Sequence, residues 1–85
     1  MATYIDVSER VFLIKYSFSM GKQVICAQKD IAQTLRENRT NRGVDFIKEF
    51  QPHKGTFKTV SKNQLELYFS WDTEAMEELK KDHLI

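Results

Sequence analysis

The chain has 85 residues, a formal net charge of +1, 12% aromatic residues and one cysteine. This length accommodates a single domain with one core, and one cysteine excludes an intrachain disulfide framework. With no apolar run long enough to span a membrane and no signal-peptide pattern at the N-terminus, we expect a cytoplasmic protein without a membrane partner.

The first predicted elements are two strands joined by a tight turn. The segment 11–19 carries apolar side chains with a period of two, which is typical of a strand with one buried face: Phe12, Ile14, Tyr16 and Phe18. Gly21 accepts the positive φ of a turn, and residues 23–27 form the second strand. The pattern therefore predicts a β-hairpin over residues 11–27.

Two helices are predicted next. Asp30 is a favourable N-cap for a short helix that ends near Asn38. A second helix begins at Thr40 or Asn41 and places apolar side chains on one stripe: Val44, Ile47 and Phe50. It ends before Pro52, because proline disfavours helical geometry at the preceding residue.

A second hairpin and a final helix complete the chain. Residues 57–61 alternate as a strand, residues 61–63 form a turn, and residues 65–71 place alternate apolar side chains on one strand face. Asp72 or Thr73 then caps a helix whose last turn carries lysines, as the helix dipole favours.

The predicted element order is therefore ββααββα. It indicates a small α+β domain over residues 1–85, with an antiparallel sheet made of two hairpins and with helices on one face. So short a chain buries only a modest share of its surface, and a homodimer that enlarges the core is one assembly to consider.

The charges are unevenly distributed along the chain. Residues 36–62 hold seven basic and three acidic residues, whereas residues 66–85 hold two basic and six acidic ones. A local positive field of this kind attracts a polyanion even when the total charge is near zero.

This basic mid-section predicts a binding protein rather than an enzyme. Arginine offers a planar fork that suits phosphate oxygens, and unpaired bases stack on aromatic rings, for which Phe57 and Tyr68 are candidates. We therefore predict that the mid-section engages RNA or single-stranded nucleic acid, alone or in a protein complex, with RNA favoured. The predicted phosphate contacts are Arg36, Arg39, Arg42, Lys54, Lys58 and Lys62.

Two alternatives follow from resemblances. In size and general character the chain resembles small phage accessory proteins that disable host enzymes or toxins, although no residue carries the likeness. This implies a stoichiometric inhibitor or adaptor that acts on a host nuclease, toxin or other nucleic-acid enzyme, with the acidic C-terminal helix imitating phosphates.

The second resemblance concerns residues 29–35, which are similar to the first helix of bacterial helix-turn-helix repressors. It implies a winged DNA binder with residues 41–50 as the second helix and the second hairpin as the wing. The likeness ends at Arg36 and Glu37, where that pattern has a small residue followed by an apolar one.

No catalytic residue, metal ligand or cofactor is predicted. His53, His83 and Cys26 do not have the spacing of a zinc site, and no Ser, Thr or Cys lies in a motif with a general base. The one enzymatic hypothesis is a minimal hydrolase in which His53 and His83 act as acid and base.

Overall fold

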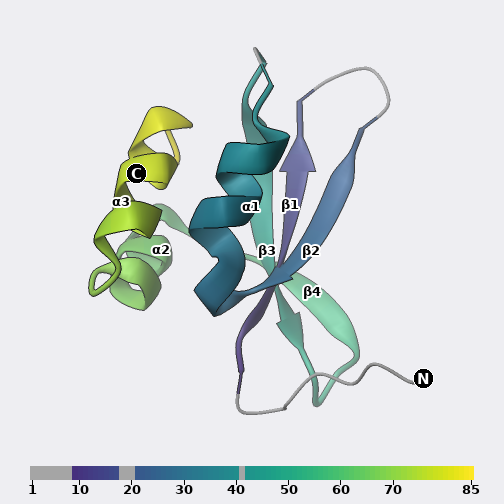
Figure 1. Cartoon of the computed structure of the whole chain (residues 1–85). Helices are drawn as coiled ribbons and strands as arrows, with labels where there is room; N and C mark the ends of the chain where they lie inside the picture. The colour runs from purple at the N-terminus through teal and green to yellow at the C-terminus, as the bar shows by residue number, and fades with distance from the viewer. Residues whose placement is uncertain (1–8, 18–20, 41) are drawn as a thin grey trace, which may run out of the picture.

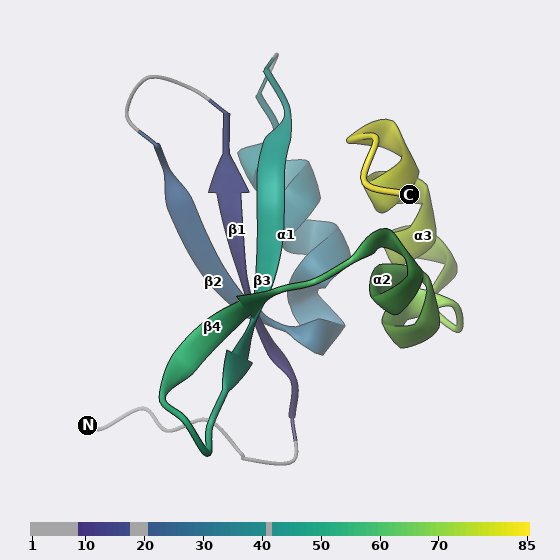
Figure 2. The same cartoon turned by 180° about the vertical axis from the view of Figure 1, so that it is seen from behind.

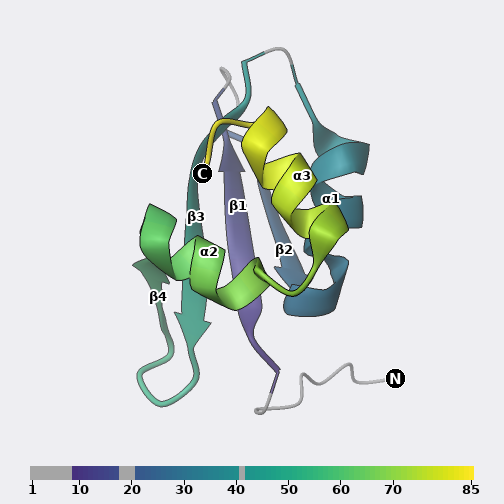
Figure 3. The same cartoon turned by 90° about the vertical axis from the view of Figure 1, so that its left-hand side faces the viewer.

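The computed structural model describes residues 9–17, 21–40 and 42–85. In these ranges four strands form one antiparallel sheet in the order β2-β1-β3-β4. The helices α1, α2 and α3 all lie on one face of this sheet (Figures 1 and 3). The elements are β1 (Val11–Tyr16), β2 (Gln23–Ala27), the 3₁₀ turn η1 (Gln28–Asp30), α1 (Ile31–Asn38), β3 (Val44–Gln51), β4 (Thr56–Thr59), α2 (Lys62–Phe69) and α3 (Thr73–Lys81).

The predicted α+β class is confirmed, with an antiparallel sheet of two hairpins and helices on one face. The observed order ββαββαα agrees roughly with the predicted ββααββα. The difference comes from two segments that exchange type. Residues 44–50 form a strand instead of a helix, and residues 65–69 belong to helix α2 instead of a strand.

The sequence of Val44–Gln51 fits both the spacing of a helix and the period of two of a strand. Its apolar residues Val44, Ile47 and Phe50 have helical spacing, but Phe46, Lys48 and Phe50 also alternate as in a strand. Pairing with β1 on one side and β4 on the other makes this segment a central strand, and such context overrides weak local preference. The second helix of the winged helix-turn-helix interpretation would fall on this strand, so that interpretation is wrong.

The segment that follows β4 is a helix because its start is capped. Ser61 and Gln64 form a reciprocal capping box, in which the Gln64 backbone N–H donates to the Ser61 hydroxyl at 3.3 Å. The turn predicted at 61–63 is therefore wrong. Leu65 in α2 is buried, whereas Leu67 in α2 and Trp71 just after it are exposed, although a strand would place all three on one face.

The core lies between the sheet and the helices. Strand β1 contributes Phe12, Ile14 and Tyr16, which confirms the predicted apolar face of this strand; Phe18 lies outside the described residues. Ile47 of β3 and Val60, which follows β4, also belong to this core. The helices contribute most of the remaining apolar side chains, and the rings of Phe12 and Phe69 lie 5.3 Å apart. The fully buried helical side chains are Ile31, Leu35, Phe69, Ala75 and Leu79.

The predicted starts of the first and last helices are confirmed in position. Asp30 is the N-cap of α1, although its side chain makes no capping hydrogen bond. Asp72 caps α3, because its side chain accepts a hydrogen bond from the backbone N–H of Ala75 at 3.1 Å. At the other end of α3, Asp82 and His83 close the helix, and His83 has a positive φ of 59°.

Candidate functional site

Arg36 in the last turn of α1 and Arg39 directly after it face the acidic helix α3. Arg36 lies 3.4 Å from a carboxylate oxygen of Glu74 and 3.4 Å from one of Glu78. Arg39 donates to both carboxylate oxygens of Asp82, from Nε at 3.1 Å and from Nη2 at 3.0 Å. Two arginines of the basic mid-section are therefore paired with carboxylates of the acidic C-terminal segment within the molecule.

Arg39 is the centre of this ion-pair cluster. Its Nη2 lies 2.7 Å from Oε1 of Glu78, and the side chains of Glu78 and Asp82 are each only 4% exposed. Hydrogen bonding to Arg39 is the main reason that the pKa of Glu78 is lowered. The pKa of Arg39 is raised, chiefly by its hydrogen bonds to Asp82 and also by those to Glu78. The geometry thus gives Arg39 a structural role between α1 and α3.

The six predicted phosphate contacts do not share one surface. Arg42 is exposed at the start of β3, whereas Lys54 lies in the turn at its other end (Figure 1). The eight residues of β3 separate these two positions by about 25 Å. Lys58 lies on β4 and Lys62 begins α2, and both are exposed.

A different surface combines aromatic rings with positive charge. We call it the helix-free face, because all the described helices cover the opposite side of the sheet (Figure 2). Directly paired residues share a face, and the strand register assigns to it Val11, Leu13, Lys15, Gln23, Ile25, Ala27, Phe46, Lys48, Phe50, Phe57 and Thr59. These side chains include two lysines and no carboxylate.

Phe46 lies next to both lysines of this face. Lys15 is its direct partner on β1, with Nζ 5.5 Å from the ring centroid. Lys48 follows on the same side of β3, with Nζ 4.9 Å from the centroid. Both ammonium groups are within cation–π range, so the ring and its two lysines form one compact unit.

A second aromatic unit lies further along the same strand. Phe50 and Phe57 are directly paired, with ring centroids 5.2 Å apart and planes tilted by 53°. Phe50 is four residues from Phe46, or about 13 Å along β3. The face therefore offers two aromatic positions in line, with the lysines nearer the first.

Sequence reasoning identified only part of this surface. Phe57 was a predicted stacking residue and lies on the helix-free face. Tyr68, the other candidate, lies on the helical side, with its ring 6.1 Å from that of Phe12 and 4.0 Å from the guanidinium carbon of Arg10. Phe46 and Phe50 were missed because their segment was assigned to a helix; the alternation of Phe46, Lys48 and Phe50 was the signal.

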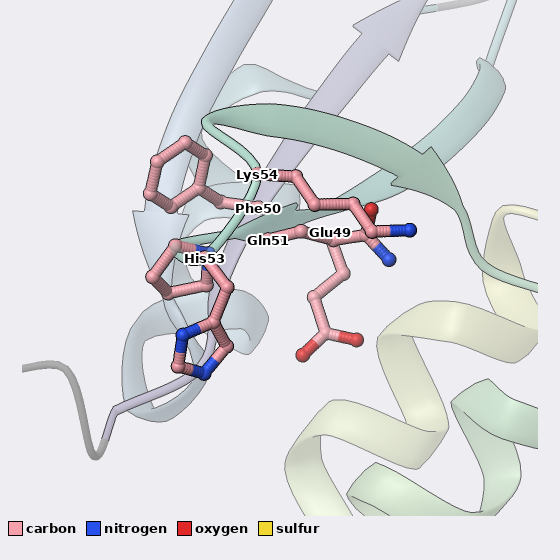
Figure 4. A pocket seen from close by; sticks show the side chains of 6 residues that line it. Glu49, Phe50, Gln51, His53 and Lys54 are labelled. Carbon is pink, nitrogen blue, oxygen red and sulfur yellow. The ribbon is translucent and has the colours of Figure 1, made fainter.

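A shallow hollow adjoins Phe50 at the β3–β4 turn. Its volume is about 260 Å³, and its lining consists of Glu49, Phe50, Gln51, Pro52, His53 and Lys54. In Figure 4 the rings of Phe50 and His53 lie to one side, and the polar side chains of Glu49, Gln51 and Lys54 lie to the other. The carboxylate of Glu49 also forms an ion pair with Arg10.

The two histidines are not brought together. His53 lies in the turn where β3 ends, whereas His83 follows α3, which packs at the opposite end of the sheet next to Arg39 (Figure 1). The hypothesis of a His53–His83 acid–base pair is therefore wrong. Among the residues that the structure describes, no group of three or more His, Cys, Asp or Glu side chains is placed to hold a metal ion.

Comparison with protein-family models, curated proteins and solved structures finds no match for this chain. No helix in the described ranges is both long and apolar enough to cross a membrane. The function is therefore inferred from the geometry of the helix-free face and of the exposed side chains.

Proposed function

We propose that this chain is a non-enzymatic protein that binds RNA or other single-stranded nucleic acid on the helix-free face, alone or within a protein complex. One observation carries the proposal: a sheet face without carboxylates holds Phe46 between Lys15 and Lys48. Sheet-borne aromatic rings that stack unpaired bases, with cations beside them for the backbone, are a recurrent solution for binding single strands.

In the proposed site, the aromatic rings contact bases and the lysines contact phosphates. A base stacks on the Phe46 ring, and the ammonium groups that lie against the ring move to the phosphates on either side of that base. The Phe50–Phe57 pair receives a second base about 13 Å further along β3. A duplex does not suit the site, because its bases are already stacked on one another.

The basic residues predicted from the sequence have a secondary place in this proposal. The exposed Arg42 and Lys54, at the two ends of β3, supply further phosphate contacts to the bound nucleic acid. Lys58 and Lys62 lie on the helical side and have no role at this face. Arg36 and Arg39 contribute only if they leave the carboxylates of α3, which makes them poorer candidates than the lysines of the sheet.

Fluorescence anisotropy with a labelled short uridine oligonucleotide tests the proposal. We expect Phe46→Ala to weaken binding by about 5- to 150-fold, since stacking contributes about 1–3 kcal/mol per base. Lys15→Ala and Lys48→Ala should each lower the slope of affinity against salt by about 0.7, as expected when one phosphate contact is lost from a single strand.

Lys80→Ala is the matched control, because Lys80 is an exposed lysine on α3, away from the helix-free face. It should leave the affinity and most of the salt slope unchanged. Absence of any binding at low salt, or equal binding by the Phe46→Ala variant, would remove the basis of the proposal.

A second candidate function is a stoichiometric inhibitor or adaptor that binds a host protein such as a nuclease or toxin. The observation that favours it is a pair of exposed apolar side chains, Leu67 in α2 and Trp71 in the turn after it: Leu67 is 72% and Trp71 67% exposed. The Trp71 indole N–H donates to the Tyr68 carbonyl at 2.9 Å, which holds the ring in place. Large aromatic side chains of this kind are typical binding hot spots.

This candidate assigns the contact to α2 rather than to phosphate imitation by α3, because Glu78 and Asp82 are buried against arginine. A pull-down before and after nuclease treatment separates the two functions. A stoichiometric partner that survives nuclease and is lost with Leu67→Ser/Trp71→Ser, but not with Phe46→Ala, supports the inhibitor. A partner lost on nuclease treatment supports nucleic-acid binding.

A further inference from the structure

The two edge strands of the sheet differ in how well they are protected from pairing. Strand β4 has four residues, one of which is Lys58, and both short length and a lysine protect an edge. Strand β2 has five residues without charge or proline, and its register with β1 is unbroken. No other described strand pairs with the outer edge of β2. This edge is therefore the one that is open to a further strand.

The hydrogen bonds between β1 and β2 determine which backbone groups of β2 point outward. The Tyr16 N–H donates to the Lys22 carbonyl, and the Gln28 N–H donates to the Arg10 carbonyl, each at 2.9 Å. In an antiparallel pair, residues bonded in this way alternate with residues whose N–H and C=O groups point away from the partner strand. The residues of β2 that direct their backbone groups outward are Gln23, Ile25 and Ala27.

The side chain at the centre of this edge is apolar and exposed. Ile25 lies on the helix-free face opposite Leu13, and 56% of it is exposed. An apolar edge of this kind is a template for pairing with another chain. Because β2 carries no charge, two copies of it do not repel each other, whereas two copies of β4 would each bring a lysine.

We propose that two copies of this chain pair antiparallel through the outer edges of their β2 strands, about a two-fold axis at Ile25. The Ile25 N–H of each copy donates to the carbonyl of the partner's Ile25, and the Ala27 N–H donates to the carbonyl of the partner's Gln23. The Ala27 carbonyl takes no part, because Ala27 is the N-cap of η1 and its carbonyl accepts the first bond of that turn. The edge is thus complementary to itself, as a two-fold interface requires.

The paired chains form one sheet with a shared helix-free face. Directly paired residues lie on the same face, so the two-fold axis places the helices of both copies on one side and the Phe46 rings of both on the other. The contact is only about 17 Å long, and an interface of this size is typical of a weak dimer that depends on concentration. The pairing requires no nucleic acid, so it is independent of the proposed function.

Sedimentation velocity tests the pairing, with the wild-type chain at micromolar to millimolar concentration and without nucleic acid. We expect the fraction of dimer to rise with concentration. Ile25→Lys places two lysines against each other at the axis and should leave a monomer at every concentration. Leu67→Lys is the matched control, because Leu67 is an exposed apolar residue of α2, and it should leave the dimer unchanged.

Oxidative cross-linking assigns the register. In a Cys26→Ser background, Ile25→Cys should form a disulfide-linked dimer, because a hydrogen-bonded pair has its Cα atoms about 5.5 Å apart, within the range that disulfides span. Gln23→Cys is the control, because the proposed register separates the two copies of position 23 by about 13 Å along the strands. A thermal melt verifies that each variant is folded.

The results divide clearly. A rising dimer fraction that is abolished by Ile25→Lys and kept by Leu67→Lys, with cross-linking at position 25 alone, supports the β2 interface. A chain that is monomeric at every concentration overturns it, and so does a dimer that persists in Ile25→Lys. Loss of the dimer in Leu67→Lys, or cross-linking as fast through position 23 as through position 25, also overturns it.

Discussion

Replacing Arg39 with alanine removes the side chain that joins the end of α1 to α3. The variant loses two hydrogen bonds to Asp82, the ion pair with Glu78 and a hydrogen bond of 3.3 Å to the Glu78 carbonyl. Two carboxylates whose side chains are 4% exposed then remain with fewer partners. The substitution therefore leaves two buried carboxylates, Glu78 and Asp82, which repel each other without the arginine between them.

The loss of folding free energy can be estimated from the contacts that Glu78 keeps in the variant. Removing one partner of a buried ion pair costs about 3–5 kcal/mol. Glu78 keeps Arg36 and Lys81 at 3.4 and 3.6 Å, and the Arg39 side chain is 29% exposed, so water reaches the site. We therefore expect the lower end, about 3 kcal/mol, out of roughly 4–13 kcal/mol for a domain of this length. Tm should fall by about 12–24 °C.

The loss of stability in Arg39→Ala should depend on pH. In the wild type the pKa of Glu78 is lowered, so its contribution to stability is present above its unfolded pKa and disappears as pH falls through the lowered value. In Arg39→Ala the lowering is largely lost, and protonation relieves an uncompensated buried charge. The difference between wild type and variant should be largest near neutral pH and should shrink below about pH 4.

Thermal unfolding followed by circular dichroism at neutral and acid pH measures both quantities. Arg42→Ala is the matched control, because Arg42 is exposed and its loss should change stability by no more than about 0.5 kcal/mol. A Tm change below about 2 °C for Arg39→Ala, or one that is the same at both pH values, would refute the structural role of Arg39.

Three further substitutions test local features of the fold. Ser61→Ala removes the capping box of α2 and should cost about 1 kcal/mol in urea unfolding; an unchanged midpoint would contradict the helix start. Tyr16→Phe should be neutral or stabilising, because the buried hydroxyl has no hydrogen-bond partner among the described residues. It should also abolish the loss of stability between about pH 10 and 12, which arises because burial raises the pKa of Tyr16 to about 12. His83→Gly should stabilise by about 0.5–1 kcal/mol in thermal melts, since His83 has a φ of 59° where glycine is favoured; destabilisation would show that the imidazole has contacts of its own.

The proposed interface was less predictable than the fold. Phe57 and Lys48 belonged to the stretch that the sequence marked as basic and aromatic, but Lys15 lies in a different part of the chain. Its position over Phe46 depends on the pairing of β1 with β3. Likewise, the arginines at 36 and 39 are about forty residues from the carboxylates that bind them, a separation at which sequence patterns indicate no contact.

Local patterns determined several elements of this protein. The period of two in residues 11–16, the cap at Asp72 and the lysines in the last turn of α3 are short-range features, and the α+β class follows from them. Tertiary structure decided the type of residues 44–50 and 65–71, because a run of seven or eight residues satisfies a period of two and a helical stripe equally well. Pairing with β1 and β4 distinguished the two for residues 44–50. For residues 65–71, burial of Leu65 and Phe69 on the helical side of the sheet did so together with the local capping box of Ser61 and Gln64. The tertiary fold also decided which charged side chains are paired within the molecule. It placed Arg36 and Arg39 against carboxylates of α3, and it left Lys15 and Lys48 of the sheet beside an aromatic ring.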